Sequence, residues 1–237
     1  MCYIKGENMK ILVADFDYTF FTLDYIKNIR SVQQFVAEGN MFIIATGRNL
    51  KQLLDDVKDL YVPYFFLICN DGALIYDRKN ELFYEKEIPI DIANSLYHKL
   101  DKCRFLSEIY MDNGSECSIH TEDKVIKIIA KPKNFDKAMH FLPKLLENFP
   151  EVDGYISESW LNIVSKEATK GKGIEFLLQK FHLDANEVYV VGDGPNDISM
   201  LEKYKGYALT SSPLEVQEKA LGTIATFQDI FAIMKQG

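Results

Sequence analysis

Acidic residues stand directly after two apolar segments of this chain, in a pattern suited to metal-assisted chemistry. Asp15 and Asp17 follow an apolar run near the N-terminus, and Asp193 and Asp197 follow another such run far along the chain. Uninterrupted apolar runs are typical of strands buried on both faces of a parallel sheet. Ligands of such sheets bind beyond the carboxyl ends of the strands. We therefore expect the four carboxylates to converge on one edge of a sheet.

Four carboxylates at one place would raise one another's pKa and destabilise the fold unless a cation neutralises them. Hard oxygen ligands select Mg²⁺, which also tends to bridge a substrate phosphate. We accordingly predict a magnesium site made by Asp15, Asp17, Asp193 and Asp197. For any one of these loops, Asp, Gly and Asn could simply mark a strand-to-helix turn. Two acidic clusters at two strand ends argue against that simpler interpretation.

The elements that must position these residues alternate between strand and helix. This order predicts a parallel sheet with right-handed crossovers, and therefore an α/β fold with a three-layer, Rossmann-like core. The expected strands are 10–14, 41–45, 64–69, 187–191 and 207–209, and the main expected helices are 23–38, a segment ending near 60, 172–181 and 197–203.

The pattern changes between residues 80 and 165, which we interpret as an α+β cap domain inserted into the core. The expected cap elements are helices 88–102 and 134–148 and strands 104–111, 117–120, 124–131, 152–157 and 160–164. The core domain would then comprise residues 9–79 and 166–237, with the cap over the strand ends. Residues 1–8 are expected to be flexible, and Met9 is an alternative start.

Composition narrows the class of protein further. The chain has 237 residues, of which 47 % are hydrophobic and 26 % charged, as in ordinary globular proteins. Its net charge of −8 disfavours nucleic acid as a partner. No apolar stretch approaches the roughly 18 residues of a membrane helix, and no signal peptide is evident. Four cysteines without a C-x-x-C pair indicate reduced thiols and a cytoplasmic location. We expect a monomer or a weak homodimer.

Four short motifs resemble those of the haloacid dehalogenase (HAD) superfamily. They are D-F-D-Y-T at 15–19, A-T-G-R at 45–48, a lysine opening a late helix, and G-D-G-P-N-D at 192–197. The inserted domain resembles that of the superfamily's Cof-like subclass IIB phosphatases. The resemblance implies a Mg²⁺-dependent phosphomonoester hydrolase that works through an aspartyl-phosphate on a small phosphorylated metabolite such as a sugar phosphate.

The resemblance also implies a role for each matching residue. Asp15 would be the nucleophile, and Asp17 would protonate the leaving alcohol and then deprotonate the attacking water. Lys170 would offset the charge on Asp15 and on the transferring group. The implied phosphate-binding residues are Thr46, Gly47, Arg48, Lys170 and Asn196, and the implied metal ligands are Asp15, the main chain of Asp17, Asp193 and Asp197, with Asn196 a further candidate. For Arg48 the alternative is a salt bridge that only anchors the following helix.

Three positions depart from the family pattern or leave it ambiguous. Tyr18 stands where a glycine is common, and Asp71 replaces the usual Asn of an N-G-A turn. Lys170 and Lys172 both fit the third motif, and the family spacing favours Lys170. Two other functions stay open: a phosphomutase of the same subclass, and a non-catalytic metabolite-binding protein.

Two features of the cap have a structural and a functional interpretation. Its lysine-rich stretch, which includes Lys124, Lys127 and Lys131, is expected to be a solvated face, although one lysine could recognise an anionic substrate. Trp160 is expected to pack within the cap rather than to stack on a substrate.

Overall fold

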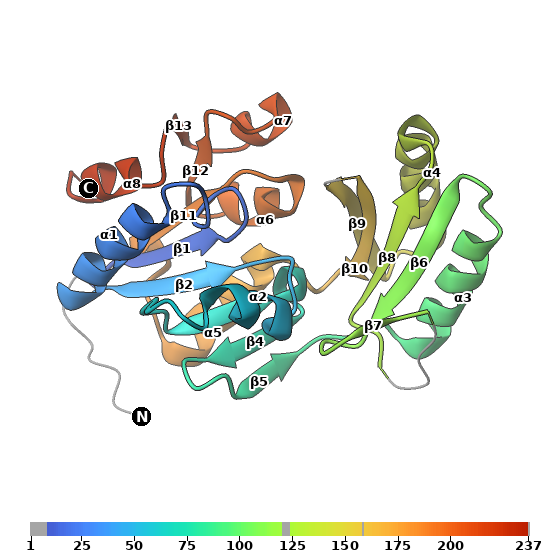
Figure 1. Cartoon of the computed structure of the whole chain (residues 1–237), viewed down its shortest axis with the longest axis horizontal. Helices are drawn as coiled ribbons and strands as arrows, with labels where there is room; N and C mark the ends of the chain where they lie inside the picture. Colours follow the sequence, from blue (N-terminus) through green and yellow to red (C-terminus); the bar gives the residue numbers. More distant parts are fainter. Residues whose placement is uncertain (1–8, 120–123, 158, 237) are drawn as a thin grey trace.

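Two β-sheets, each with its own helices, make up the fold (Figure 1). The computed structural model describes residues 9–119, 124–157 and 159–236, so the prediction for residues 1–8 lies outside the described part. The first sheet has the strand order β13-β12-β11-β1-β2-β3-β4-β5, and the second has the order β7-β6-β8-β10-β9.

Six of the eight strands of the first sheet pair in parallel, and β4 and β5 extend it by antiparallel pairing. Its strands are β1 (Ile11–Asp15), β2 (Met41–Ala45), β3 (Phe66–Cys69), β4 (Leu74–Asp77), β5 (Leu82–Glu85), β11 (Val188–Gly192), β12 (Lys205–Leu209) and β13 (Gly222–Ile224). Its helices are α1 (Tyr25–Ala37), α2 (Leu50–Val57), α5 (Lys170–Phe181), α6 (Ile198–Leu201), α7 (Leu214–Gln217) and α8 (Asp229–Met234).

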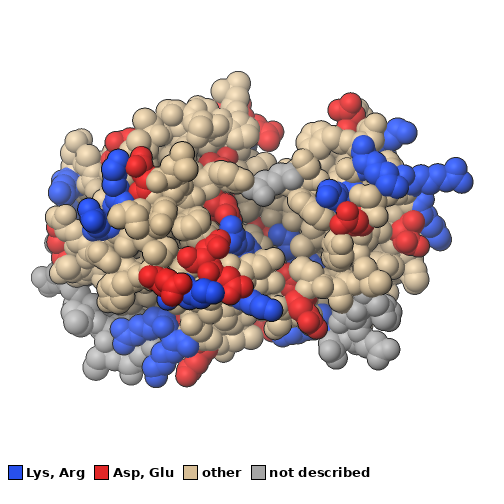
Figure 2. All heavy atoms as spheres, in the orientation of Figure 1, with Lys and Arg blue, Asp and Glu red and all other residues tan. Residues whose placement is uncertain are grey.

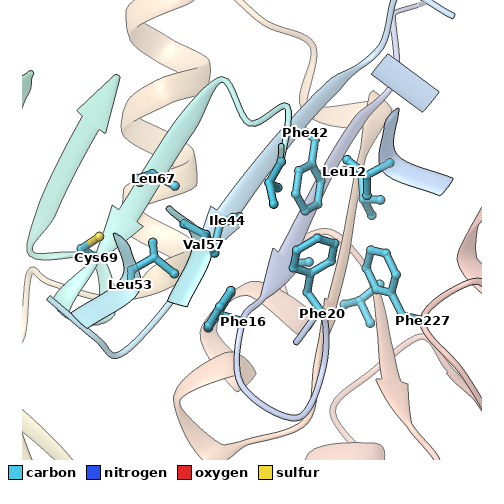
Figure 3. Close-up of a cluster of buried hydrophobic side chains, with 14 of the residues drawn as sticks. Leu12, Phe16, Phe20, Phe42, Ile44, Leu53, Val57, Leu67, Cys69 and Phe227 are labelled. Carbon is cyan, nitrogen blue, oxygen red and sulfur yellow. The ribbon is translucent and has the colours of Figure 1, made fainter. Parts of the chain in front are cut away.

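Alternating side chains of the strands build an apolar cluster on each face of this sheet. Leu12 of β1 belongs to the cluster that α1, α2 and α8 cover, whereas its neighbour Val13 belongs to the cluster that α5, α6 and α7 cover. Figure 3 shows the first cluster, with Phe16 and Phe20 of the loop after β1 packed into it. Burial on both faces explains why these strands are uninterrupted apolar runs. The predicted three-layer α/β fold is confirmed.

The second sheet is antiparallel and carries its helices on one face. Contacts of α3 with β6 and of α4 with β9, together with the positions in Figure 1, place both helices on the side away from the first sheet. Its elements are α3 (Ile90–Asp101), β6 (Leu106–Asp112), β7 (Cys117–Ser118), β8 (Lys127–Pro132), α4 (Phe135–Asn148), β9 (Val152–Ser157) and β10 (Trp160–Ser165). Its other face is therefore free to meet the first sheet's edge.

The antiparallel hairpin β4–β5 differs from the sequence prediction. Residues 74–77 are buried like a central strand, and the short turn Asn70–Gly72 before them reverses the chain without a crossover helix. The sequence predicted that the insert starts at residue 80. However, β5 (Leu82–Glu85) pairs with β4 and therefore belongs to the first sheet. We propose that the cap domain begins after Glu85 and ends near Ser165.

Two smaller findings bear on the chemistry. Within the described residues, Cys69, Cys103 and Cys117 are free thiols. No helix of the described part of the chain is both long and apolar enough to cross a bilayer.

Candidate active site

The loop after β1 presents Asp15 and Asp17 at the edge of the first sheet. Asp15 is the last residue of β1, and its carbonyl accepts a hydrogen bond from the N–H of Phe20 at 3.2 Å. Phe16 and Phe20 are buried beneath the loop and anchor it. Tyr18 has a left-handed backbone (φ 59°) and a largely exposed side chain. Glycine adopts that conformation at the lowest cost, which gives the family's preference at this position a physical reason.

Lys170 connects the loop after β1 with the loop after β11 by bonding a carboxylate of each. Its Nζ donates to Asp15 Oδ1 at 2.5 Å and to Asp197 Oδ1 at 2.7 Å, and the side chain is 0 % exposed. The neighbouring Lys172 instead bonds the Lys166 carbonyl and pairs with Glu167 at the surface. Lys170 is therefore the lysine at the acidic cluster, but it lies behind the carboxylates and does not line the cavity.

Local turns hold this lysine and its partners in place. The hydroxyl of Thr169 accepts from the N–H of Lys172 at 3.2 Å and so caps the start of α5, where Lys170 is the first residue. The Oδ2 atom of Asp197 accepts from the N–H groups of Asp193 and Gly194, each at 2.9 Å. This leaves Asp197 Oδ1 aimed at Lys170.

Asp15, Asp193 and Asp197 form a cluster in which one carboxylate oxygen of each residue lies within 4.8 Å of the others. Burial, with the nearby charge of Asp197, raises the pKa of Asp193 to about 6, and burial raises the pKa of Asp15 well above its ordinary value. Burial opposes the charge of Lys170, but Asp15 and Asp197 raise its pKa. One ammonium thus faces three carboxylates, which is the imbalance that a second cation corrects.

This donor set fits a magnesium ion. All its ligand atoms are hard carboxylate oxygens, which Mg²⁺ prefers, and no sulfur or imidazole is among them. Asp193 is additionally oriented by Thr19, whose Oγ1 donates to Asp193 Oδ1 at 2.6 Å. Asp17, the fourth predicted ligand, is not part of this carboxylate cluster.

Arg48 donates two parallel hydrogen bonds to Asp17. Its Nε donates to Asp17 Oδ2 at 2.8 Å and its Nη2 to Asp17 Oδ1 at 2.6 Å, while Nη1 reaches Asp56 on α2. This fork geometry is specific to guanidinium, and it fixes the plane of the carboxylate. The Asp17 hydrogen bonds raise the pKa of Arg48, with burial opposing them. Both partners line the cavity, so Arg48 contacts Asp17 there as well as Asp56 on α2.

The remaining predicted phosphate-binding residues fall into two groups. Gly47 and Asn196 line the cavity, whereas Thr46 is 0 % exposed and its hydroxyl accepts from the N–H of Arg48 at 3.1 Å. Asn196 donates through Nδ2 to Asp71 Oδ1 at 2.9 Å. A Cβ atom at Gly47 would stand 3.1 Å from that same Asp71 oxygen, so the glycine allows the two loops to approach.

The second sheet contributes a buried lysine that the sequence analysis expected on a solvated face. Lys127 of β8 reaches across to the core, where its Nζ donates to Asp71 Oδ2 at 2.6 Å and to the Gly47 carbonyl at 3.4 Å. It also donates to the Tyr155 hydroxyl at 3.3 Å. Lys131 lies four residues further along the strand and therefore on the same face, yet it is exposed, so strand alternation alone does not separate the two lysines.

A cavity of about 480 Å³ lies between the acidic edge and this face of the second sheet. The core side contributes the following lining residues: Asp15, Asp17, Tyr18, Gly47, Arg48, Gln52, Asp193, Gly194, Asn196 and Asp197. The cap side contributes Tyr110, Cys117, Lys127, Ile129, Tyr155, Ser157, Trp160 and Asn162. Trp160, expected to pack within the cap, thus borders the cavity. Figure 2 shows acidic and basic side chains gathered where the two parts meet.

Comparison with known proteins agrees with this arrangement. A sequence model of the haloacid dehalogenase-like hydrolases matches residues 12–140 and 102–235. The chain belongs to this family, and it is a hydrolase. It is 28 % identical over 247 residues to a protein of Haemophilus influenzae named "Putative phosphatase", with 92 % of this chain and 93 % of that protein covered. A Buchnera aphidicola protein of the same name is also 28 % identical, with 81 % and 82 % covered.

Solved structures share the whole fold. A haloacid dehalogenase-like hydrolase from B. subtilis superposes with a TM-score of 0.84 at 17 % identity, covering 96 % of this chain and 99 % of that one. A structure described as a subclass IIB sugar phosphatase gives a TM-score of 0.78 at 20 % identity, covering 96 % and 97 %. At these identities the likeness establishes the fold alone.

Proposed function

We propose that this hydrolase is a Mg²⁺-dependent phosphomonoesterase that acts through an aspartyl-phosphate on a small phosphorylated metabolite, such as a sugar phosphate. Family membership and the names of its relatives support phosphatase chemistry. The observation that carries the proposal is the placement of Asp15, paired with a buried lysine, beside Asp193 and Asp197 on the wall of the cavity between the two sheets.

The residues of the chain suit the two half-reactions of such an enzyme. In the first, an oxygen of Asp15 attacks phosphorus, the bond from phosphorus to the alcohol oxygen breaks, and Asp17 gives that oxygen a proton. In the second, Asp17 takes a proton from water as the water oxygen attacks phosphorus, which releases phosphate and restores Asp15. The Arg48 fork would hold Asp17 in one orientation for both proton transfers.

Positive charge around the transferring group supplies much of the stabilisation in phosphoryl transfer. Lys170 would neutralise part of the charge of Asp15 and Asp197, and Gly47 and Asn196 would face the phosphoryl oxygens. Asp15, Asp193 and Asp197 would hold Mg²⁺, which when bound supplies a Lewis acid toward those oxygens. The second sheet would exclude bulk water and select the substrate.

Hydrolysis of p-nitrophenyl phosphate with and without Mg²⁺ tests the proposal. We expect Mg²⁺-dependent release of phosphate by the wild type and a loss of at least about 1,000-fold in Asp15→Asn, which removes the nucleophile. Asp55→Asn, a change of an exposed carboxylate on α2, is the matched control and should keep the wild-type rate. Wild-type activity in Asp15→Asn would refute the proposal. With a hexose phosphate, release of phosphate rather than an isomer separates hydrolase from mutase.

A further inference from the structure

The feature that carries a further inference is the buried ion pair between the two sheets. Lys127 and Asp71 have side chains only 5 % and 4 % exposed, with 2.6 Å between Nζ and Oδ2. Both groups lie at the cavity: Lys127 lines it directly, and Asp71 is bound to the lining residue Asn196. A lysine carried by the cap is thus brought to the place where a substrate would sit, and a core carboxylate meets it there.

Asp71 stays ionised in this position. Burial alone would raise its pKa, but the charges of Lys127 and Lys170, with hydrogen bonds from Lys127 and Asn196, lower the pKa to about 2. The positive charge that Lys127 brings to the cavity is therefore matched at neutral pH by a full negative charge in direct contact.

Among the described residues, Arg48 is the other cation that lines the cavity, and its charge is also compensated. Its guanidinium bonds both oxygens of Asp17 and also pairs with Asp56. Each lining lysine or arginine of the described chain is therefore already ion-paired. A substrate bearing a second anionic group, beyond the reacting phosphate, would find no uncompensated cation there, and like charges brought together cost affinity.

The rest of the cap-side wall is uncharged but polar. It combines aromatic rings, Tyr110 and Trp160 with centroids 6.3 Å apart, with the hydroxyl of Ser157 and the amide of Asn162. Rings that offer an apolar face beside hydrogen-bonding groups suit a polyhydroxylated carbon chain.

We propose that Asp71 is a specificity residue, which cancels the charge of Lys127 so that the cavity accepts phosphate esters of neutral, polyhydroxylated alcohols and rejects those whose alcohol part carries a second anion. This inference rests on the proposed function and adds to it the charge of the leaving group. Without the Asp71 carboxylate, Lys127 would be an unmatched cation and would attract a second anion.

A pair of substrates that differ by one charge tests this. Sorbitol 6-phosphate and gluconate 6-phosphate have the same carbon chain, with CH₂OH in one where the other has a carboxylate. We would measure their inhibition constants as competitors of p-nitrophenyl phosphate hydrolysis. The wild type should bind sorbitol 6-phosphate at least about 10-fold more tightly, and Asp71→Asn, which keeps the shape but not the charge, should lower that ratio by at least about 10-fold.

The double variant Asp71→Asn with Lys127→Met provides the matched control. It removes both charges, so the preference for sorbitol 6-phosphate should return, whereas a merely structural role of the pair would leave the ratio unchanged in every variant. Equal or tighter binding of gluconate 6-phosphate by the wild type would overturn the proposal even if Asp71→Asn did not fold. An unchanged ratio in a folded Asp71→Asn would also overturn it.

Failure of the proposed function would look different. It would appear as absent p-nitrophenyl phosphate hydrolysis by the wild type. Titration calorimetry of the two phosphates with wild type and variants would still give the same affinity ratio, and would support or overturn the role of Asp71 independently of turnover.

Discussion

At the scale of single residues, Lys170 compensates only part of the negative charge of the three clustered carboxylates. The ammonium contacts two carboxylates, Asp15 and Asp197, while Asp193 receives a hydrogen bond from Thr19 instead. Removing a carboxylate from such a crowded cluster relieves repulsion when no metal is bound, but it also removes one of the proposed magnesium ligands. The two effects oppose each other and can be measured separately.

The substitution Asp193→Asn separates the relief of repulsion from the loss of a ligand. Without metal, we expect a melting temperature no lower than that of the wild type, because a carboxylate whose pKa is raised by burial, together with the charge of Asp197, is gone. With Mg²⁺ at about 100 times its Kd, the wild type should gain roughly 2.7 kcal/mol, and the variant should gain less than half of that. Thermal melts with and without Mg²⁺ measure both quantities. A variant that keeps the full magnesium response would show that Asp193 is not a ligand.

The Arg48 fork makes a second prediction at this scale. Arg48→Lys keeps the charge but cannot bond both oxygens of Asp17 in parallel. We expect kcat/KM to fall about 10- to 100-fold with little change in melting temperature, because Asp17, the proposed acid–base group, would be displaced and proton transfer would slow. Asp56→Asn, which removes only the bond to α2, is the control and should stay within about twofold of wild type. A rate near wild type in Arg48→Lys would mean that the fork has no catalytic role.

At the scale of elements, the site depends on how closely the turn after β3 approaches the start of α5. Gly72 has φ +108°, and a Cβ atom built on it would lie 2.2 Å from the carbonyl oxygen of Thr169. Thr169 caps the helix that begins with Lys170, and the residue before Gly72 is Asp71. One close backbone contact therefore fixes both the buried Lys170 and the carboxylate that meets the cap.

Gly72→Ala should accordingly be costly. We expect a loss of roughly 2–5 kcal/mol in the free energy of unfolding, from backbone strain together with overpacking. Gly39→Ala is a matched control because Gly39 has φ +90° and nothing within 4 Å of the built Cβ. It should lose only about 1 kcal/mol. Urea unfolding of both variants gives the comparison, and equal losses would show that the contact with Thr169 is unimportant.

At the scale of the whole molecule, the Lys127–Asp71 pair ties the second sheet to the first and makes stability depend on pH. The folded-state pKa of Asp71 is lowered from 3.8 to about 2. A lowered pKa contributes stability that is present above the unfolded value and lost as pH falls toward the folded one. The contribution is about 2 kcal/mol above pH 4, and it disappears between pH 4 and pH 2.

Unfolding of the wild type and of Asp71→Asn at different pH values measures this contribution of Asp71 to stability. The wild type should be more stable than the variant at pH 6, and the difference should shrink by about 2 kcal/mol as pH falls to 2. A difference that is independent of pH would contradict the assigned ion pair.

The sequence predicted the strands that end in the site better than it predicted the contacts across it. Met41–Ala45 was predicted with its observed bounds because a fully buried strand is an unbroken apolar run. The strands β4 and β5 were missed because they form an antiparallel hairpin after a tight turn. No helix separates their apolar segments, so the alternation of strand and helix did not reveal them. Lys127 was misjudged because its burial arises from Asp71, 56 residues earlier in the chain.

The same limit applies to roles within the site. Asp15, Asp193 and Asp197 come together because parallel strands bring their carboxyl ends to one edge. Lys170 joins them from the start of α5, as the motifs predicted. The pairing of Arg48 with Asp17 depends on side-chain geometry that spacing does not specify.

The central claim is that Asp15 becomes phosphorylated during turnover, and trapping the intermediate tests it most directly. Acid quenching of the Mg²⁺-loaded enzyme during turnover of a ³²P-labelled phosphomonoester, followed by peptide mapping, would locate the phosphoryl group. We predict acid-stable, hydroxylamine-labile label on the peptide that contains Asp15, and none in Asp15→Asn. Label on another peptide, or rapid turnover with no labelled enzyme, would contradict the account.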